Sequence, residues 1–238
     1  MNPESRDDRP VRPRVLVTGA TRGIGRGVVD TLSPAYDVVV AGRRSTDIRA
    51  VAAQTGAAAS LVIDLAEPAA LAVACQDLGE VDAVVHCAGI EGTAVAADLG
   101  PDFFSRVLAV NLAGPVELTR LTLPGLRRRR GHVVFVNSTA ALGAFSGWGA
   151  YAASKAGLRA YADVLRTDER PHGVRVTSVF PGRTDTGMQR DIAAKLGTMF
   201  DAATAMPPSS VASAVRYVLD APADAEIGEL TISPVPVA

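Results

Sequence analysis

The stretch RVLVTGATRGIG, residues 14–25, decides the fold of this chain. Its first five residues, RVLVT, contain a short apolar run with β-branched side chains, which indicates a buried strand, and a helical pattern follows through Leu32. Gly19, Gly23 and Gly25 let the backbone come close to a ligand, and the start of the helix offers free N–H groups and the positive end of its dipole. Strand, glycine turn and helix in this order predict a phosphate-binding site at the turn.

A second apolar run, YDVVVA at residues 36–41, ends in Gly42-Arg43-Arg44. An acidic residue near this point binds the ribose 2′-hydroxyl of NAD, whereas an arginine accommodates the 2′-phosphate of NADP. This chain has Arg43 and Arg44 here and no acidic residue beside them, with Arg22 in the glycine turn as a third contact. The pattern predicts a preference for NADP(H) over NAD(H). The alternative is that these arginines are solvated loop charges.

Strand-like runs alternate with helical patterns along the rest of the chain. Strands are expected at 14–18, 36–41, 60–63, 82–86, 131–138, 174–180 and 229–232. Helices are expected after the glycine turn and at 48–54, 67–78, 101–130, 150–168 and 209–219. Alternation without hairpin signals predicts parallel strands joined by right-handed crossovers. We therefore expect an α/β fold, a three-layer Rossmann-like doubly wound parallel sheet of about seven strands. It would form one domain, residues 14–238, after a flexible N-terminal arm, residues 1–13.

Tyr151 and Lys155 are four residues apart in an expected helix, so their side chains share one face. A nearby ammonium group favours the phenolate and would lower the pKa of the tyrosine toward the value that suits a general acid/base. Only Lys155 and Lys195 are lysines among the 24 basic residues, so a compact ammonium group stands here in a chain that otherwise uses arginine. The alternative is a core tyrosine beside a surface lysine.

Several other polar residues stand where a binding site is expected. Asn111 lies within an apolar helical run, so it is either a structural pin or a site residue. Ser138 ends the strand 131–138, and ligands bind beyond the carboxyl ends of such strands. His86 also ends a strand, but a hydrogen-bonded core histidine is favoured over a catalytic one. The weakly periodic segment 183–206 is expected to be a mobile apolar loop over the site.

Charge and cysteine content exclude several other classes of protein. The formal charge, 24 − 25 = −1, gives no reason to expect nucleic acid or a membrane surface as a partner, and Arg127–Arg130 is interpreted as the solvated end of a helix. Cys75 and Cys87 are too few for a disulfide framework or a zinc site, so no metal is expected. No apolar run approaches the roughly 18 residues of a membrane span. A cytoplasmic location is expected.

The motifs taken together resemble those of a known family. Thr18-Gly19-x-x-x-Gly23-x-Gly25, Asn111, Ser138, Tyr151-x-x-x-Lys155 and Pro181-Gly182 follow one another as in short-chain dehydrogenases/reductases, and the chain resembles the compact single-domain subgroup over nearly its whole length. The resemblance implies an NADP(H)-dependent oxidoreductase that interconverts a carbonyl group and an alcohol on a small molecule. It also implies a homodimer or homotetramer; Leu158, Tyr161 and Leu165 fit either such an interface or core packing.

The resemblance also implies roles for individual residues. Tyr151 would be the general acid/base, and Lys155 would lower its pKa and bind the nicotinamide ribose. Ser138 would hold the substrate oxygen, and Asn111 would position a water molecule linking Lys155 to solvent. Together with the arginines above, the expected cofactor contacts are Gly19, Thr21, Arg22, Gly23, Ile24, Gly25, Arg43, Arg44, Asp64, Ala88, Gly89, Tyr151, Lys155, Pro181, Gly182, Thr184 and Thr186.

One departure from the family pattern concerns Cys87, which precedes Ala88-Gly89 where the family usually has an asparagine. The replacement removes an amide that braces the sheet.

The alternative to an enzyme is an NADP(H)-binding sensor or scaffold protein without turnover, since a fold does not determine a function. Such proteins commonly lose the tyrosine or the lysine, and this chain keeps both.

Overall fold

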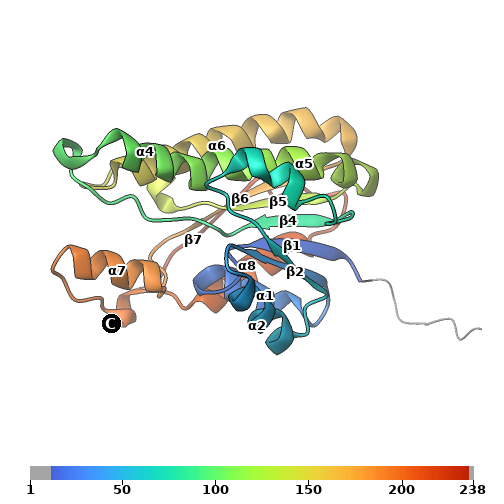
Figure 1. Ribbon diagram of the computed structural model, residues 1–238, viewed down its shortest axis with the longest axis horizontal. Helices are drawn as coiled ribbons and strands as arrows, with labels where there is room; N and C mark the ends of the chain where they lie inside the picture. The colour runs from blue at the N-terminus through green and yellow to red at the C-terminus, as the bar shows by residue number, and fades with distance from the viewer. Residues whose placement is uncertain (1–11, 236–238) are drawn as a thin grey trace, which may run out of the picture.

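A sheet of seven parallel strands runs through the centre of the molecule (Figure 1). The computed structural model describes residues 12–235, and the strand order is β3-β2-β1-β4-β5-β6-β7. The strands are β1 (Arg14–Thr18), β2 (Asp37–Gly42), β3 (Ala59–Val62), β4 (Ala83–His86), β5 (His132–Val136), β6 (Arg175–Pro181) and β7 (Glu229–Ile232). The predicted doubly wound parallel α/β sheet is confirmed. The expected arm, residues 1–13, lies almost entirely outside the described residues.

Helices cover both faces of this sheet, below and above it in Figure 1. One face is covered by α1 (Gly23–Leu32), α2 (Ser45–Thr55) and α8 (Pro208–Leu219). The other is covered by α3 (Leu71–Ala74), α4 (Pro101–Leu108), α5 (Gly114–Arg129) and α6 (Gly149–Glu169). The remaining helix, α7 (Gly187–Lys195), follows β6 and stands apart from both layers in Figure 1. Short 3-10 turns lie at Pro68–Ala70, Ala96–Asp98, Thr139–Ala141, Arg170–His172 and Ala202–Thr204.

The strands are buried on both faces, which explains why their sequences are continuous apolar runs. All five residues of β5 are buried. Val17 and Val134 pack in the core beneath α1 and α8, whereas Leu16 and Phe135 pack in the core beneath α5 and α6. The strand order reverses between β1 and β4, and in such sheets the crevice at the carboxyl ends of the two strands is where a ligand binds.

The expected single helix over 101–130 is wrong, because a π-helical turn, Ala109–Ala113, separates α4 from α5. The turn contains Asn111, whose side chain is fully buried and bonded to another segment. Wider turns of this kind often mark functional sites, where they re-aim a side chain. Gly114 follows at a point of close packing, because a Cβ atom there would lie 2.4 Å from the carbonyl oxygen of Leu65.

The expected loop over 183–206 is also wrong, because it contains α7. Thr186 caps this helix by accepting a hydrogen bond from Gln189 N. The guanidinium carbons of Arg183 and Arg190 lie 5.0 and 5.2 Å from the centroid of the Phe200 ring. These contacts join residues within the segment and give it an ordered structure of its own. The helix expected over 67–78 is shorter as well, with the 3-10 turn Pro68–Ala70 followed by the single turn of α3.

Candidate active site

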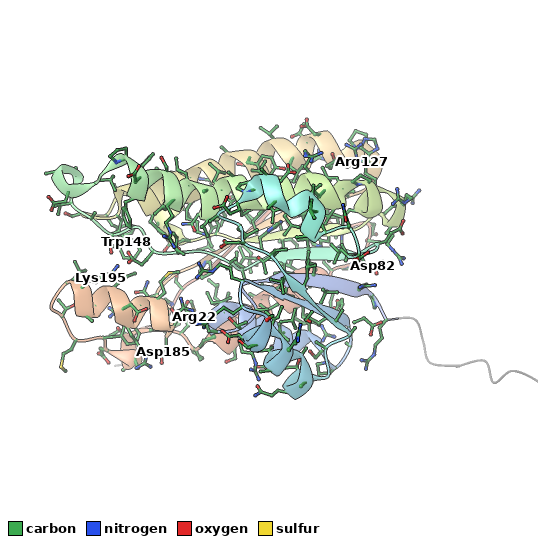
Figure 2. The ribbon with its side chains drawn as sticks, viewed as in Figure 1. Arg22, Asp82, Arg127, Trp148, Asp185 and Lys195 are labelled. Atoms are coloured by element: carbon green, nitrogen blue, oxygen red, sulfur yellow. The ribbon has the colours of Figure 1, made fainter. Side chains whose placement is uncertain are left out.

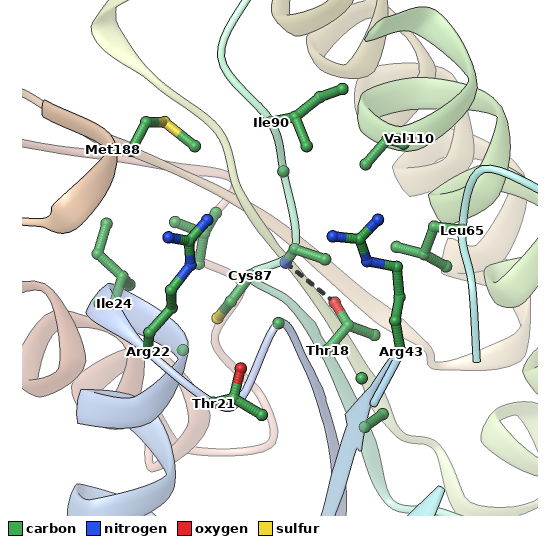
Figure 3. Close-up of a pocket in the computed structure, with 18 of the residues that line it drawn as sticks. Thr18, Thr21, Arg22, Ile24, Arg43, Leu65, Cys87, Ile90, Val110 and Met188 are labelled. Atoms are coloured by element: carbon green, nitrogen blue, oxygen red, sulfur yellow. Dashed lines mark hydrogen bonds between the residues drawn. The ribbon is translucent and has the colours of Figure 1, made fainter. Parts of the chain in front are cut away.

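A cavity of about 230 Å³ lies at the carboxyl ends of the strands, where the strand order reverses. Its walls come from the β1–α1 turn, the ends of β2 to β5, and helices α4, α6 and α7 (Figure 3). The predicted site residues that line it are Gly19, Thr21, Arg22, Gly23, Ile24, Gly25, Arg43, Asp64, Ala88, Gly89, Tyr151, Lys155 and Thr186. The structure therefore brings together most of the cofactor contacts expected from the sequence.

The glycine turn is built for close approach of backbone segments. Gly19 has φ of 63°, and a Cβ atom on it would lie 2.6 Å from the Cα atom of Ala88. The dashed line in Figure 3 marks the hydrogen bond that Ala88 N donates to Thr18 Oγ1 at 3.1 Å, which holds the turn against the end of β4. No side chain caps the start of α1, and its first turn has no acidic residue. Its N–H groups are left for an anion.

Two of the three predicted arginines reach the cavity. Figure 3 shows Arg22 and Arg43 on its opposite sides, with Thr21 between them at the turn. Arg44 does not contribute, because its Nε atom hydrogen-bonds to Asp47 at 2.6 Å and its side chain is 80% exposed. The interpretation of Arg44 as a cofactor contact is therefore not supported. It pairs with Asp47 because that residue follows three positions later in the first turn of α2.

Tyr151 and Lys155 lie side by side on α6 at the inner end of the cavity, as the spacing predicts. Both are buried, and Lys155 Nζ lies 5.8 Å from the centroid of the Tyr151 ring. Lys155 Nζ donates a hydrogen bond to Val136 O at 3.0 Å, which fixes it against the end of β5. Ser138 does not itself line the cavity, but its side chain lies beside the Tyr151 hydroxyl and would favour the phenolate. Trp148 packs edge-on against the Tyr151 ring, with the ring centroids 5.5 Å apart.

The pKa shifts at this pair differ from the expectation. Burial raises the pKa of Tyr151 above its usual value, and the hydrogen bond with Ser138 opposes that rise. The predicted lowering by Lys155 is not found, since burial dominates. Burial also lowers the pKa of Lys155 to about 8. At neutral pH the phenol is therefore protonated and the ammonium group still carries its charge.

Asn111 is a structural pin for the segment after β4. Its Nδ2 atom donates to Ile90 O at 3.0 Å and to Ser154 Oγ at 3.1 Å, and its Oδ1 atom accepts from Ile90 N at 2.9 Å. A Cβ atom added to Gly89 would lie 3.3 Å from Asn111 Oδ1 and 3.9 Å from Lys155 Nζ. The amide thus lies near Lys155 and holds Gly89-Ile90 in the cavity wall.

His86 is a core residue, as predicted. Its Nε2 atom pairs with Thr119 Oγ1 at 2.9 Å, and its ring stacks on Phe135 at 4.9 Å. Burial lowers the pKa of His86 to about 3 and raises the pKa of Cys87 to about 12. The imidazole is therefore neutral and the thiol protonated at neutral pH, so neither serves as a reactive group.

Three predicted cofactor contacts, Pro181, Gly182 and Thr184, do not line the cavity. Gly182 N bonds to Ile232 O at 2.8 Å, and Thr184 Oγ1 donates to Gly182 O at 3.0 Å. They shape the chain between β6 and α7, and so place Thr186 at the cavity.

At the far end of α7, Lys195 forms an ion pair with Glu91 in the segment after β4. Helix α7 is thereby held over one side of the site.

The basic run lies at the opposite end of the molecule. Figure 2 shows Arg127 and Asp82 at one end, whereas Arg22, Trp148, Asp185 and Lys195 gather at the other. Arg127 pairs with both carboxylate oxygens of Glu169, at 2.7 and 2.8 Å, and the next two arginines pair with Glu80. The run ends helix α5, as interpreted from the sequence, but Arg127, Arg128 and Arg129 are paired with acidic residues rather than simply solvated.

Sequence reasoning missed several lining residues, including Arg106, Val110, Asn137 and Met188. Arg106 and Val110 are four positions apart on the stretch that carries Asn111, so the helical period could have found them once one face was assigned to the site. Asn137 lies beside Ser138, is 4% exposed, and has no hydrogen-bond partner for either amide atom within residues 12–235. A buried amide without a partner is costly in a folded protein, which points to a ligand at this place.

Comparison with known proteins places this arrangement in a family. The family model described as short chain dehydrogenase matches residues 13–197. The chain belongs to the short-chain dehydrogenase/reductase family. The proteins that it resembles are named as dehydrogenases and reductases.

Three similar proteins illustrate the match. Dehydrogenase/reductase SDR family member 7B of Bos taurus is 35% identical over 190 residues, which are 73% of this chain and 58% of that protein. Glycine betaine reductase ATRR of Emericella nidulans is 33% identical over 234 residues, 92% of this chain and 18% of that protein. The chain thus spans less than two thirds of these two relatives. The closed form of a serine dehydrogenase complexed with NADP+ has a TM-score of 0.85 at 29% identity, covering 94% of this chain and 96% of that chain.

The site of this dehydrogenase/reductase fits a nicotinamide dinucleotide. The uncapped start of α1 and two arginines suit its phosphate groups, and the buried amide of Asn137 suits a polar group beside Tyr151. Within residues 12–235, no group of three or more His, Cys, Asp or Glu side chains is arranged to hold a metal ion. Over the same part of the chain, every helix is too short or too polar to cross a bilayer.

Proposed function

We propose that this protein is an NADP(H)-dependent oxidoreductase that interconverts a ketone or aldehyde with the corresponding alcohol, with Tyr151 as the general acid/base. The observation that carries the proposal is that Tyr151 and Lys155 line the same cavity as the glycine turn, with Ser138 beside the Tyr151 hydroxyl. A bound nicotinamide cofactor would supply or accept the hydride. The protein would bind it, orient it and handle the proton.

Tyr151 would give its proton to the carbonyl oxygen during reduction. Its raised pKa keeps the phenol protonated at neutral pH, which suits a proton donor. Ser138, which lies beside the Tyr151 hydroxyl, would hold the same oxygen from a second direction. The charged Lys155 at 5.8 Å from the ring centroid would stabilise the phenolate that remains after transfer. The protonated phenol that reduction needs is therefore the form present near neutral pH, whereas oxidation would need the deprotonated phenol.

The preference for NADP(H) rests on Arg22 and Arg43. Neither forms an ion pair with an acidic residue within residues 12–235, and both line the cavity. Arg43 follows β2, where the 2′-substituent of the adenosine ribose would lie, so its guanidinium would pair with a phosphate there. The serine dehydrogenase of similar fold was solved with NADP+. We expect NADPH to bind at least about tenfold more tightly than NADH, or about 1.4 kcal/mol.

Assembly and location belong to this proposal as well. We propose a homodimer or homotetramer in the cytoplasm. Leu158 and Leu165 are buried in the core and Tyr161 packs against it, so these three residues do not form the interface considered from the sequence. Val164 on the same helix is 59% exposed and is available for an interface. Light scattering of the purified protein would measure its mass in solution.

Replacement of Tyr151 by Phe tests the central assignment. The hydroxyl is lost while the ring and its packing against Trp148 are kept. The wild type should oxidise NADPH with at least one member of a panel of aldehydes and ketones, and the variant should bind NADPH with unchanged affinity but lose turnover by more than about a hundredfold. Retained turnover would disprove the role of Tyr151. NADPH binding by the wild type without turnover of any panel member would favour a sensor or scaffold protein instead.

A further inference from the structure

A row of three aromatic rings leads from the active site to the surface. Trp148 packs edge-on against the Tyr151 ring, with the ring centroids 5.5 Å apart, and Phe145 packs against Trp148 at 6.4 Å. Exposure rises along the row, because Tyr151 is buried, Trp148 is half-buried and Phe145 is 55% exposed. We define these three residues as the aromatic row. Its inner end lines the cavity and its outer end is in water.

Backbone contacts hold the aromatic row in place. Ala152 N donates a hydrogen bond to Trp148 O at 2.8 Å, which joins the row to the first turn of α6. On the other side, Ala94 N donates a hydrogen bond to Gly147 O at 2.8 Å, and Ala94 pairs with Trp148 in a short parallel bridge. The row is therefore ordered before a ligand binds, which reduces the entropic cost of binding.

Exposed apolar side chains gather in the segments around this row, which follow β4, precede α6 and follow α7. We define as the apolar rim the exposed residues Val95, Leu142, Phe145, Leu196 and Met199. The hydrogen bond between Ala94 and Gly147 joins the first two segments, and the ion pair of Glu91 with Lys195 joins the first to the third. Figure 2 shows Trp148 and Lys195 at the same end of the molecule. Apolar side chains that gather in this way mark a binding surface.

A substrate whose carbonyl group lies at Tyr151 and Ser138 would meet the aromatic row with the rest of its structure. Ser138 and Phe145 belong to the same segment between β5 and α6, so the row begins where the reaction would take place. The rings of Trp148 and Phe145 suit an aromatic ring or an alkyl chain. Each methylene group that is fully buried raises affinity by about fourfold. A small polar carbonyl compound would leave the outer rings in water and gain nothing from them.

We propose that the aromatic row and the apolar rim select carbonyl substrates that carry an aromatic ring or a long alkyl chain, with Phe145 as a specificity-determining residue. This inference rests on the proposed function, because it presupposes that a carbonyl group is reduced at Tyr151. It adds a substrate class to that function. The occupant of the row is a small apolar molecule, since the row is continuous with the active-site tyrosine.

Reduction of butanone, 2-octanone and acetophenone by the whole protein with NADPH tests the substrate class. The wild type should have a kcat/KM at least about thirtyfold higher for the two larger ketones than for butanone. Phe145→Ser should lower that ratio by about tenfold, through the KM of the larger ketones rather than through kcat. Tyr217→Ser is the matched control, because it removes another exposed aromatic ring, on α8, and should leave the ratio unchanged.

The fluorescence of Trp148 gives a second measurement that does not depend on turnover. Trp148 is the only tryptophan of the chain, so its emission reports on the aromatic row directly. Benzamide shares the ring of acetophenone but carries an amide in place of the ketone, and acetamide lacks the ring. With NADP+ present, benzamide should change the emission of the wild type saturably and acetamide should not. Phe145→Ser should raise the half-saturating concentration of benzamide by about tenfold.

Other outcomes overturn the inference in recognisable ways. Equal kcat/KM for the three ketones, or an unchanged ratio in Phe145→Ser, would show that the aromatic row does not select the substrate, while turnover would leave the proposed function intact. If Phe145→Ser changes the mass in solution by light scattering and not the ratio, the rim is a subunit interface. If no ketone is reduced but benzamide still changes the emission saturably, the proposed function fails, and the row binds an apolar ligand that is not a substrate.

Discussion

Asn111 binds both backbone groups of Ile90, accepting a hydrogen bond from its N–H at 2.9 Å and donating one to its carbonyl oxygen at 3.0 Å. The π-helical turn Ala109–Ala113 aims the amide at this segment, and Ile90 extends the cavity wall that begins at the end of β4. The Asn111 side chain thus makes the two backbone hydrogen bonds that a neighbouring strand would otherwise make with Ile90. The cavity wall depends on it because Ile90 lies beyond the last paired residue of β4.

Asn111→Leu should destabilise the protein and weaken NADPH binding. The change keeps the branched shape of the side chain but leaves two backbone groups of Ile90 without partners, which costs about 1–3 kcal/mol each when they are buried. Urea unfolding would measure a loss of about 2 kcal/mol or more. Ser154→Ala is the control, because it removes only one of the hydrogen bonds of Asn111 and should cost about 1 kcal/mol. Equal stability of Asn111→Leu and wild type would contradict the role of the pin.

Lys155→Met should remove a characteristic dependence of stability on pH. Burial lowers the pKa of Lys155 from 10.5 to about 8 in the folded protein. Between these values the unfolded chain binds the proton and the folded chain does not, so the free energy of unfolding rises with pH. Burial of the charged lysine thus lowers the free energy of unfolding below pH 8, and this loss disappears as the lysine is neutralised. The wild type should gain about 1 kcal/mol relative to the variant between pH 8 and pH 9.

The comparison with the variant separates Lys155 from the other buried groups. The raised pKa values of Cys87 and Tyr151 lower stability as these groups ionise in the unfolded chain, but both residues are present in wild type and variant, so this contribution cancels in the difference. Urea midpoints for both proteins at half-unit pH steps would give the difference. Parallel curves for wild type and variant would show that Lys155 titrates in the folded protein as it does in the unfolded chain.

Ser138→Ala should change both the rate and the pH profile of turnover. The hydrogen bond from Ser138 opposes the burial that raises the pKa of Tyr151, so its loss raises that pKa further. Alcohol oxidation, which needs the phenolate, should therefore shift its rising limb to higher pH, and kcat should fall about a hundredfold because the substrate oxygen loses a donor. A purely structural role for Ser138 would lower the rate without moving the profile.

The sequence predicted the features that arise locally and missed those that arise from contacts between distant segments. Apolar runs and glycines gave every strand and the phosphate-binding turn, because burial on two faces leaves a continuous pattern. The interruption at Asn111 could not be read from helical periodicity, since it depends on a partner 21 residues away. Helix α7 is short and held by Lys195 and Phe200 contacts rather than by its own pattern.

The arginines show the same limit. Arg43 and Arg44 are neighbours in the sequence, which predicts the same role for both, but successive residues point in different directions, and Asp47 holds Arg44 away from the cavity. Arg106 lies more than 60 positions from either and reaches the site only because α4 packs over the carboxyl end of the sheet. The charge around the cofactor cavity is therefore a property of the fold more than of any single motif.

Alanine substitutions at two glycines should have opposite effects on stability. A Cβ atom on Gly25 would lie 2.2 Å from the carbonyl oxygen of Gly19, so Gly25→Ala must displace the backbone of the phosphate-binding turn and should cost more than about 2 kcal/mol. At Gly125, within α5, the new methyl group would meet only Glu80 at 3.6 Å or more, an ordinary contact. Gly125→Ala should therefore stabilise the protein by about 0.5–1 kcal/mol through its better helix propensity. Thermal unfolding of the two variants checks the signs, and NADPH titration should show weakened binding for Gly25→Ala alone. Stabilisation by Gly25→Ala would mean that the turn can relax without loss, and the close approach of Gly25 to Gly19 would then have no structural role.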